Sequence, residues 1–258
     1  MFDVHCHIHE SDVLFSSSSN NKTVYCVQAT QYTDWSRVAQ LKEEHGDRII
    51  AAFGLHPWFA HRVESGEIPE TWRAELCLLV KKYGGIVGEC GLDKAARSPD
   101  TGKPYPFEPQ VSLLKAQLAI AHELGVSVSV HCVRAFGPLA DILREAERDG
   151  SLPPRIMLHS YSGSPDMLQQ LFLKGELGTR IYASYSHIVN GRNLQKTLQC
   201  IRATPQSRVL VESDLHDVSN TLPALDRAIA MVAEAYGWQL HETREKLTEN
   251  ARAFFSNR

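Results

Sequence analysis

The stretch "EPQVSLLKAQLAIAHELGVSVSVHC" (residues 108–132) contains the repeating unit from which the fold of this chain follows. Its first part has the spacing of apolar residues expected of an amphipathic helix, and Gly125 stands where helices commonly end in a left-handed residue. A short run rich in valine follows, which predicts a buried strand. This strand ends on His131, so the unit joins a helix to a strand with a polar end.

The same unit recurs along the whole chain. Short apolar runs rich in β-branched residues alternate with helical patterns, and in one of these patterns Leu222, Leu225 and Ile229 recur at intervals of three and four residues. The clearest helical patterns are residues 69–84, 108–125, 136–150 and 221–237. The eight predicted strands are residues 2–8, 23–30, 48–56, 85–92, 126–132, 155–161, 180–186 and 208–214.

A strand followed by a helix, repeated eight times in about 250 residues, is typical of a (β/α)₈ TIM barrel. We therefore predict an α/β chain with one domain over residues 1–258, in which residues 16–21 and 93–109 are the most conspicuous loops. An open, doubly wound sheet is the alternative. The barrel is favoured because polar residues end most of the strands, and only a barrel makes these ends converge.

Composition excludes several classes of protein. Apolar residues make up 43% of the chain and charged residues 22%, which is ordinary for a globular protein, and the net charge of −3 argues against a strongly basic surface for nucleic acid. No apolar run is long enough for a membrane span, and no secretory signal is recognisable. The six cysteines form no CxxC pair. We expect a reduced, monomeric, cytoplasmic protein, with nuclear residence left open.

Histidines occupy the end of the first predicted strand. His5 and His7 are two residues apart, so both side chains are expected to point into the barrel. Two neutral imidazoles on one face can bind a single metal ion, although a buried, hydrogen-bonded histidine pair is the alternative. His9 has the same parity but lies beyond the strand, so we expect it in a loop.

Other strands end in the same kinds of side chain. Glu89 lies in an otherwise apolar run, where a carboxylate without a cation would be costly. Glu212 and Asp214 are again two residues apart, at the end of the last strand. The remaining polar residues at strand ends are His56, His131 and His159. Each has a purely structural explanation alone, but their convergence on one barrel mouth predicts a metal site.

Imidazole and carboxylate ligands favour zinc, manganese, iron or nickel, whereas magnesium prefers oxygen ligands. The set is too large for one tetrahedral ion and suits two divalent ions about 3.5–4 Å apart. Glu89 would bridge the two ions, because its strand lies between the others. The first ion would be bound by His5, His7 and Asp214, and the second by His131 and His159.

Seven motifs in family order give the chain a strong resemblance to the TatD family of metal-dependent deoxyribonucleases, within the amidohydrolase-like hydrolases. They are "DVHCH" (3–7), "GLHP" (54–57), "GECGLD" (88–93), "VHCVRA" (130–135), "LHSYSG" (158–163), "VESD" (211–214) and "NARAFF" (250–255). The resemblance implies a barrel with two divalent ions that hydrolyses phosphodiester bonds of DNA, often from an end. The ligands it implies are His5, His7, Glu89, His131, His159 and Asp214.

The chain departs from the family pattern on the substrate side of the mouth. Lys94 follows "GLD" where the family usually has an aromatic residue, and "ESDLHD" lacks the usual proline and brings His216. The segment "YASYSHIVNG" (182–191) resembles the "SFS" type of divergent members. We predict that Lys94 and His216 bind substrate and favour a terminal or short, single-stranded nucleic acid over a long duplex, which rewards an extended basic surface.

Further roles follow for residues near the predicted ions. Asp214 is the predicted general base, and Glu212 would support it or pair with a neighbouring cation. His56 would contact substrate or shape the pocket. Arg134 is a candidate phosphate ligand, with a surface salt bridge as the alternative. Lys94, Arg97 and Lys103 would form a basic rim or simply a solvated loop.

Two other functions remain as alternatives. One is hydrolysis of a C–N or C–O bond in a cyclic amide or lactone. Many relatives of that kind bridge their metals with a carboxylated lysine, but no lysine lies in any of the eight predicted strands, and Glu89 takes that place. The other is an inactive scaffold, which the cost of keeping unused buried acids and imidazoles opposes.

Overall fold

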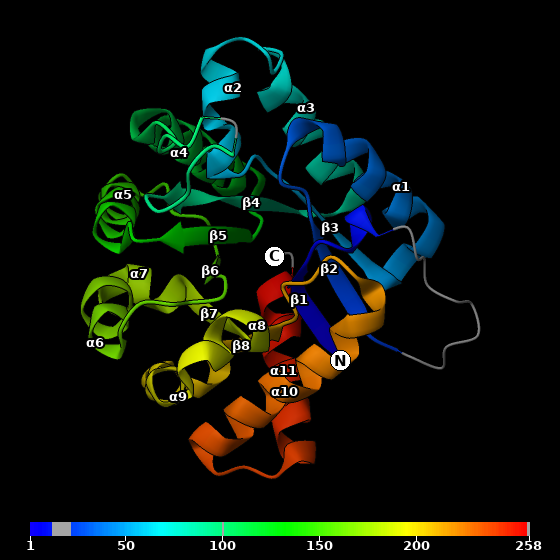
Figure 1. Cartoon of the computed structure of the whole chain (residues 1–258), viewed down its shortest axis with the longest axis vertical. Coiled ribbons are helices and arrows are strands. Elements are labelled where there is room, and N and C mark those ends of the chain that lie inside the picture. The colour runs from blue at the N-terminus through cyan, green and yellow to red at the C-terminus, as the bar shows by residue number, and fades with distance from the viewer. Residues whose placement is uncertain (12–21, 100, 257–258) are drawn as a thin grey trace.

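Eight parallel strands form one sheet in their order along the chain, and helices surround it (Figure 1). The computed structural model describes residues 1–11, 22–99 and 101–256, so the predicted polar loop at 16–21 lies outside the described residues. All eight predicted strands are present. They are β1 (Phe2–Cys6), β2 (Val24–Gln28), β3 (Ile49–Phe53), β4 (Ile86–Asp93), β5 (Val128–Val133), β6 (Ile156–Leu158), β7 (Ile181–Ser186) and β8 (Val209–Glu212).

The predicted helices are also present, with ends that differ by a few residues. Their bounds are α1 (Trp35–His45), α2 (Ala60–Glu64), α3 (Trp72–Tyr83), α4 (Phe107–Leu124), α5 (Phe136–Arg148), α6 (Pro165–Met167), α7 (Gly175–Arg180), α8 (His187–Asn190), α9 (Leu194–Ala203), α10 (Val218–Tyr236) and α11 (Leu240–Phe255). Short turns are η1 (Ile8–Glu10), η2 (Tyr32–Asp34), η3 (Gly46–Arg48), η4 (Pro57–Phe59), the π-helical η5 (Leu168–Phe172), η6 (Gly191–Asn193) and η7 (Gln206–Arg208). Within the described residues, no helix has the length and apolar character needed to cross a bilayer.

The first and last strands meet and complete the barrel. The Asp214 amide donates to the His5 carbonyl oxygen at 3.0 Å, and the His7 amide donates to the Leu215 carbonyl oxygen at 2.9 Å. The buried Asp3 carboxylate accepts from the Ser213 amide at 2.9 Å. These contacts confirm the predicted barrel and rule out the open sheet, whose two outer strands would stay apart.

The end of the barrel opposite the carboxyl ends of the strands is filled with apolar side chains and covered by a helix. A small apolar cluster inside the barrel includes Val4, Met157 and Leu210, and α11 packs Phe254 against it. The Phe254 carbonyl oxygen accepts from Arg155 Nε at 2.8 Å, which fixes the helix across this end. A larger cluster packs the outer faces of the strands against the surrounding helices. The interior is therefore accessible from the carboxyl ends of the strands, where barrel enzymes place their active sites.

Candidate metal centre

The six predicted metal ligands come together at the mouth of the barrel. Glu89, on β4, lies among the imidazoles of the ligand set, and its two carboxylate oxygens face different partners. His5 and His7 come from β1 and the residue after it, and His131 lies on β5. His159 follows β6 directly and Asp214 follows β8 by one residue. The set therefore comes from five of the eight strands of the barrel and could assemble only in the closed fold.

One half of the cluster surrounds Glu89 Oε2. This oxygen lies 3.5 Å from both His5 Nε2 and His7 Nε2, and the two ring nitrogens are 3.3 Å apart. Asp214 Oδ1 completes the group at 3.6 Å from His7 Nε2 and 3.9 Å from His5 Nε2. Two imidazole nitrogens and two carboxylate oxygens thus face a common point, as the ligands of one divalent ion do.

The other half surrounds Glu89 Oε1. His131 Nδ1 lies 2.9 Å from this oxygen and His159 Nε2 lies 2.8 Å from it, with 3.1 Å between the two nitrogens. His56 Nε2 is 3.5 Å from the same oxygen, which brings a third imidazole to this half. A carboxylate that offers one oxygen to each of two imidazole groups is placed as a bridging ligand.

The rings of His5 and His159 lie face to face within the cluster. They stack with centroids 3.9 Å apart and planes only 5° from parallel. The lone pair of an imidazole nitrogen lies in the ring plane, so stacked rings direct their lone pairs side by side and not at one point. The stacking distance matches the roughly 3.5–4 Å that separates the ions of two-metal sites.

Each histidine ligand is held through its other ring nitrogen. His5 Nδ1 is 2.9 Å from Ser129 Oγ, and His7 Nδ1 is 3.2 Å from the Gln28 carbonyl oxygen. The remaining pairs are His159 Nδ1 with Glu212 Oε1 at 3.3 Å and His131 Nε2 with Asp93 Oδ2 at 3.4 Å. Such partners fix the orientation and tautomer of a ligating imidazole and raise its basicity.

Local irregularities in two strands aim the central ligands. The pairing register shifts between Asp3 and Cys6 in β1, and again between Val87 and Cys90 in β4. A β-bulge re-aims a side chain, and each shift lies beside or around a ligand. Close packing of β4 on β5 also needs Gly91, because a Cβ there would lie 2.0 Å from the His131 carbonyl oxygen.

The ionisation of the cluster is governed by burial and by its mixed charges. Burial favours neutral groups, but the hydrogen bond to Asp214 and the charge of Glu89 raise the pKa of His7 to about 9. Burial also opposes the charged form of Glu89, but the charges of His159 and His56 hold its pKa well below the usual range. Burial lowers the pKa of His56 to about 4. The pKa of Asp214 is also lowered, so the carboxylates of both Glu89 and Asp214 are available as anionic ligands.

The donor set fits divalent metal ions. Four imidazoles and two carboxylates, all buried or nearly so and supported from behind, are the ligand types preferred by zinc, manganese, iron and nickel. Without a cation, the cluster would bring Glu89 and Asp214 into an interior where only partial protonation of the histidines offsets their charge. Among the described residues, potential ligand atoms within 4.8 Å of one another occur in three groups. These groups are His5 with His7 and Glu89, His56 with Glu89 and His131, and His5 with His159 and Glu212.

A cavity of about 570 Å³ opens over the cluster. His56 lines it, and its Nδ1 accepts from the Trp58 amide at 3.3 Å. His216 also lines it, stacked on His7 with centroids 5.1 Å apart, and its Nδ1 is 2.9 Å from Glu10 Oε2. His9, predicted in a loop, lies buried in η1, with its Nε2 3.4 Å from Asp34 Oδ2.

Three residues with predicted roles lie outside the lining of the cavity over the cluster. Glu212, predicted as a catalytic residue that supports Asp214 or pairs with a neighbouring cation, is 0% exposed, and its Oε1 lies 3.3 Å from His159 Nδ1, so its catalytic role stays a prediction. Lys94 places its ammonium 4.2 Å above the Phe107 ring, and Arg134 is exposed beyond β5. Neither residue lines the cavity over the cluster, so their predicted substrate contacts stay predictions.

Sequence reasoning missed the residues behind the ligands. Asp93 accepts from Trp58 Nε1 at 2.8 Å as well as contacting His131. Ser160 donates to Glu212 at 2.6 Å and lies 3.3 Å from Asp214 Oδ2. Asp93 has the same strand parity as Glu89, and Ser129 the same parity as His131. Parity was therefore the signal that could have placed both in the barrel.

A TIM barrel with a histidine and carboxylate cluster at the carboxyl ends of its strands is the architecture of metal-dependent hydrolases. The model of one family, described as TatD related DNase, matches residues 2–256. The chain belongs to this family.

Relatives of known name agree with this assignment. The Cut9-interacting protein scn1 of Schizosaccharomyces pombe is 27% identical, with 98% of each chain covered. The 3'-5' ssDNA/RNA exonuclease TatD of Edwardsiella piscicida is 29% identical over 73% of this chain and 66% of its own length. A crystal structure of a TatD homologue from Escherichia coli covers 98% of this chain and 97% of its own, with a TM-score of 0.73 and 24% identity, and supports the fold.

Proposed function

We propose that this chain is a nuclease that hydrolyses phosphodiester bonds with two divalent ions, which would be zinc, manganese, iron or nickel. The observation that carries the proposal is the division of Glu89, with one oxygen toward His5 and His7 and the other toward His131 and His159. Divalent ions in such a cluster lower the pKa of bound water and neutralise charge that develops on a phosphate.

The residues of the chain supply the remaining requirements. Asp214 is the proposed general base, because its carboxylate lies at the edge of the cluster and lines the cavity. Burial alone would raise its pKa, but the hydrogen bond from His7 lowers it, so the side chain is ionised near pH 7, which is the form that a general base needs. Its backbone φ of 55° is unusual for a residue other than glycine, and one residue separates Asp214 from the end of β8. Such strain is typical of positions whose orientation matters.

Two imidazoles at the cavity wall are placed to contact substrate. His56, whose lowered pKa keeps it neutral near pH 7, can hydrogen-bond a phosphate oxygen or the leaving group. His216 lies at the exposed rim above His7. We infer a single-stranded or terminal nucleic acid as substrate, because the cluster lies in a cavity within the barrel mouth and not on an open basic surface. One chain contributes every residue of the cluster, so a monomer is sufficient for activity.

One assay tests the proposal against its two alternatives, a hydrolase of cyclic amides or lactones and an inactive scaffold. Metal-loaded protein is incubated with single-stranded DNA labelled at either end, with a generic phosphodiester, and with a panel of lactones and cyclic amides. We expect cleavage of the DNA that a chelator stops and added metal restores. Asp214→Asn is the matched control for contaminating nuclease. Turnover of a lactone or amide without DNA cleavage, or no turnover by fully metal-loaded protein, would contradict the proposal.

A further inference from the structure

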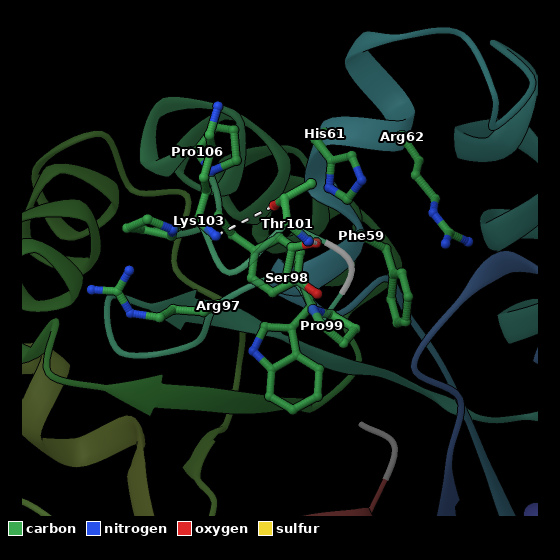
Figure 2. A pocket seen from close by; sticks show the side chains of 12 residues that line it. Phe59, His61, Arg62, Arg97, Ser98, Pro99, Thr101, Lys103 and Pro106 are labelled. Carbon is green, nitrogen blue, oxygen red and sulfur yellow. Dashed lines mark hydrogen bonds between the residues drawn. The ribbon is translucent and has the colours of Figure 1, made fainter.

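A second cavity, of about 690 Å³, lies directly beside the metal centre. One wall comes from η4 and α2, including Phe59 and His61, and the other from the long loop between β4 and α4, including Arg97 and Lys103 (Figure 2). Trp58 and Phe59 line both this cavity and the one over the cluster. The two cavities therefore share a wall and form neighbouring compartments of the barrel mouth.

Aromatic faces dominate the second cavity. The rings of Trp58 and Tyr105 are within 10° of parallel with centroids 6.3 Å apart, and His61 lies within 25° of the Tyr105 plane at 5.7 Å. Trp58 is 40% exposed, which is unusual for so large an apolar side chain. Exposed, near-parallel aromatic rings are the surfaces on which proteins stack the bases of single-stranded nucleic acid.

Cations surround these rings. The charged side chains among the described lining residues are Arg62, Arg97 and Lys103, and no carboxylate occurs among them. Figure 2 shows Arg62 on one side of the cavity and Arg97 and Lys103 on the other. The side chain of Arg97 is braced by a bond from its Nη1 to the Gly102 carbonyl oxygen at 3.0 Å. In a chain of net charge −3, this local excess of positive charge favours an anionic ligand.

Trp58 connects this cavity to the metal ligands. Its Nε1 donates to Asp93 Oδ2 at 2.8 Å, and the same oxygen is 3.4 Å from His131 Nε2. The tryptophan ring is therefore fixed between the two cavities. A base stacked on it would keep its attached phosphate close to the cluster.

We propose that the second cavity binds the base and phosphate of a nucleotide next to the scissile bond of a single-stranded substrate. The proposal rests on the proposed nuclease function, which it extends by assigning a separate binding site for one nucleotide of the substrate. Trp58 and Tyr105 would supply stacking, and Arg97 and Lys103 would bind phosphate. Bases in a duplex are already stacked and paired, so a free end or single strand suits this cavity best.

Binding can be measured without hydrolysis. Metal-free protein is titrated with deoxyadenosine monophosphate and, as a probe without a base, with deoxyribose 5-phosphate, both by calorimetry. The second cavity contains none of the proposed metal ligands, so its binding should survive metal removal. We expect the nucleotide to bind and the sugar phosphate to bind at least about fivefold more weakly, since stacking distinguishes the two.

Variants then assign the binding to this cavity. Tyr105→Ala should weaken nucleotide binding by about 5- to 150-fold, the range seen when a stacking ring is removed, whereas Tyr105→Phe keeps the ring and should bind like the wild type. Arg97→Gln with Lys103→Gln should reduce affinity for the nucleotide more than for deoxyadenosine, which lacks the phosphate. The matched control is Lys81→Gln with Arg148→Gln, which removes two exposed cations near the ends of α3 and α5.

The outcomes separate this proposal from the proposed function. If nucleotide binding depends on Tyr105 in variants that fold, the result supports nucleotide binding in the second cavity, whether or not DNA is cleaved. Equal binding of nucleotide and sugar phosphate, equal binding by Tyr105→Ala and wild type, or no binding at all would overturn it. Thermal unfolding of each variant confirms that a loss of binding is not a loss of fold. Loss of cleavage alone, with binding intact, counts against the metal chemistry and not against the cavity.

Discussion

Replacing Glu212 by glutamine tests whether a buried carboxylate behind the site supports metal binding. Glu212 Oε1 lies 3.3 Å from His159 Nδ1 and accepts from Ser160 at 2.6 Å, while its other oxygen accepts from the Ser184 hydroxyl. Glutamine keeps the shape, but its NH₂ group would face hydroxyl and imidazole donors. The variant therefore loses the anionic partner of His159 and leaves at least one buried donor without an acceptor.

The expected magnitude follows from these contacts. Loss of a partner behind a metal ligand costs about 10- to 100-fold in metal affinity, and the 3.3 Å separation from His159 places this case near the lower end. A tenfold loss corresponds to about 1.4 kcal/mol. The unsatisfied donor should lower the free energy of unfolding of the metal-free protein by about 1–3 kcal/mol.

The assay follows zinc and manganese retained by the protein against increasing chelator, together with urea unfolding of the metal-free form. Glu75→Gln is the control, since Glu75 also accepts from two hydroxyls, those of Tyr32 and Thr71, but lies on α3 away from the cluster. Unchanged metal retention would refute the supporting role. Loss of one whole ion at saturating metal would show that Glu212 is itself a ligand, as its grouping with His5 and His159 allows.

Four further predictions concern the cluster and its surroundings. Asp214→Asn should lower DNA hydrolysis by at least about 10²-fold while the circular dichroism spectrum stays unchanged, and wild-type turnover would exclude its role as base. Because the pKa of His7 is raised to about 9, the metal-free site carries a proton on His7 below that pH. Metal binding should therefore release protons, and metal affinity should fall as the pH falls. Calorimetry in buffers of different ionisation enthalpy detects the released protons. Gly91→Ala should destabilise the fold by at least about 2 kcal/mol in urea, whereas Gly137→Ala, with open space around it, should not. His216→Ala should change the rate on a dinucleotide relative to duplex DNA, and a common factor for both would exclude a role in specificity.

The fold could be predicted because each unit of sequence carries its own local signal. The run at 108–132 contains helix periodicity, a glycine and a valine-rich strand, and the structure places α4, a left-handed Gly125 and β5 there. Closure of the barrel was harder to predict, because it depends on contacts between the first and last strands. Convergence of polar strand ends was the indirect evidence for it, and the hydrogen bonds between β1 and the residues after β8 confirm it.

The convergence of the proposed metal ligands could be predicted for the same reason, whereas the residues behind them were missed, although strand parity would have placed two of them in the barrel. A ligand such as Glu89 is anomalous in its own strand, whereas Ser129 and Asp93 look ordinary until a neighbouring strand brings a histidine beside them. Lys94 was singled out by its place after a motif, whereas the position of its long side chain depends on packing against Phe107, which the motif does not encode.

Histidines in the first strand therefore serve both the site and the closure of the barrel. The peptide groups of His5 and His7 take part in the bonds that join the first strand to the chain after the last, and their imidazoles face Asp214 across the same junction. An ion bound to these three side chains would hold together the two ends of the sheet. Since the ligands are far apart in the unfolded chain, metal binding must stabilise the closed barrel by about 2.7 kcal/mol at a free metal concentration 100 times its Kd. The two imidazoles thus lie at the junction where the first strand meets the chain that follows the last strand.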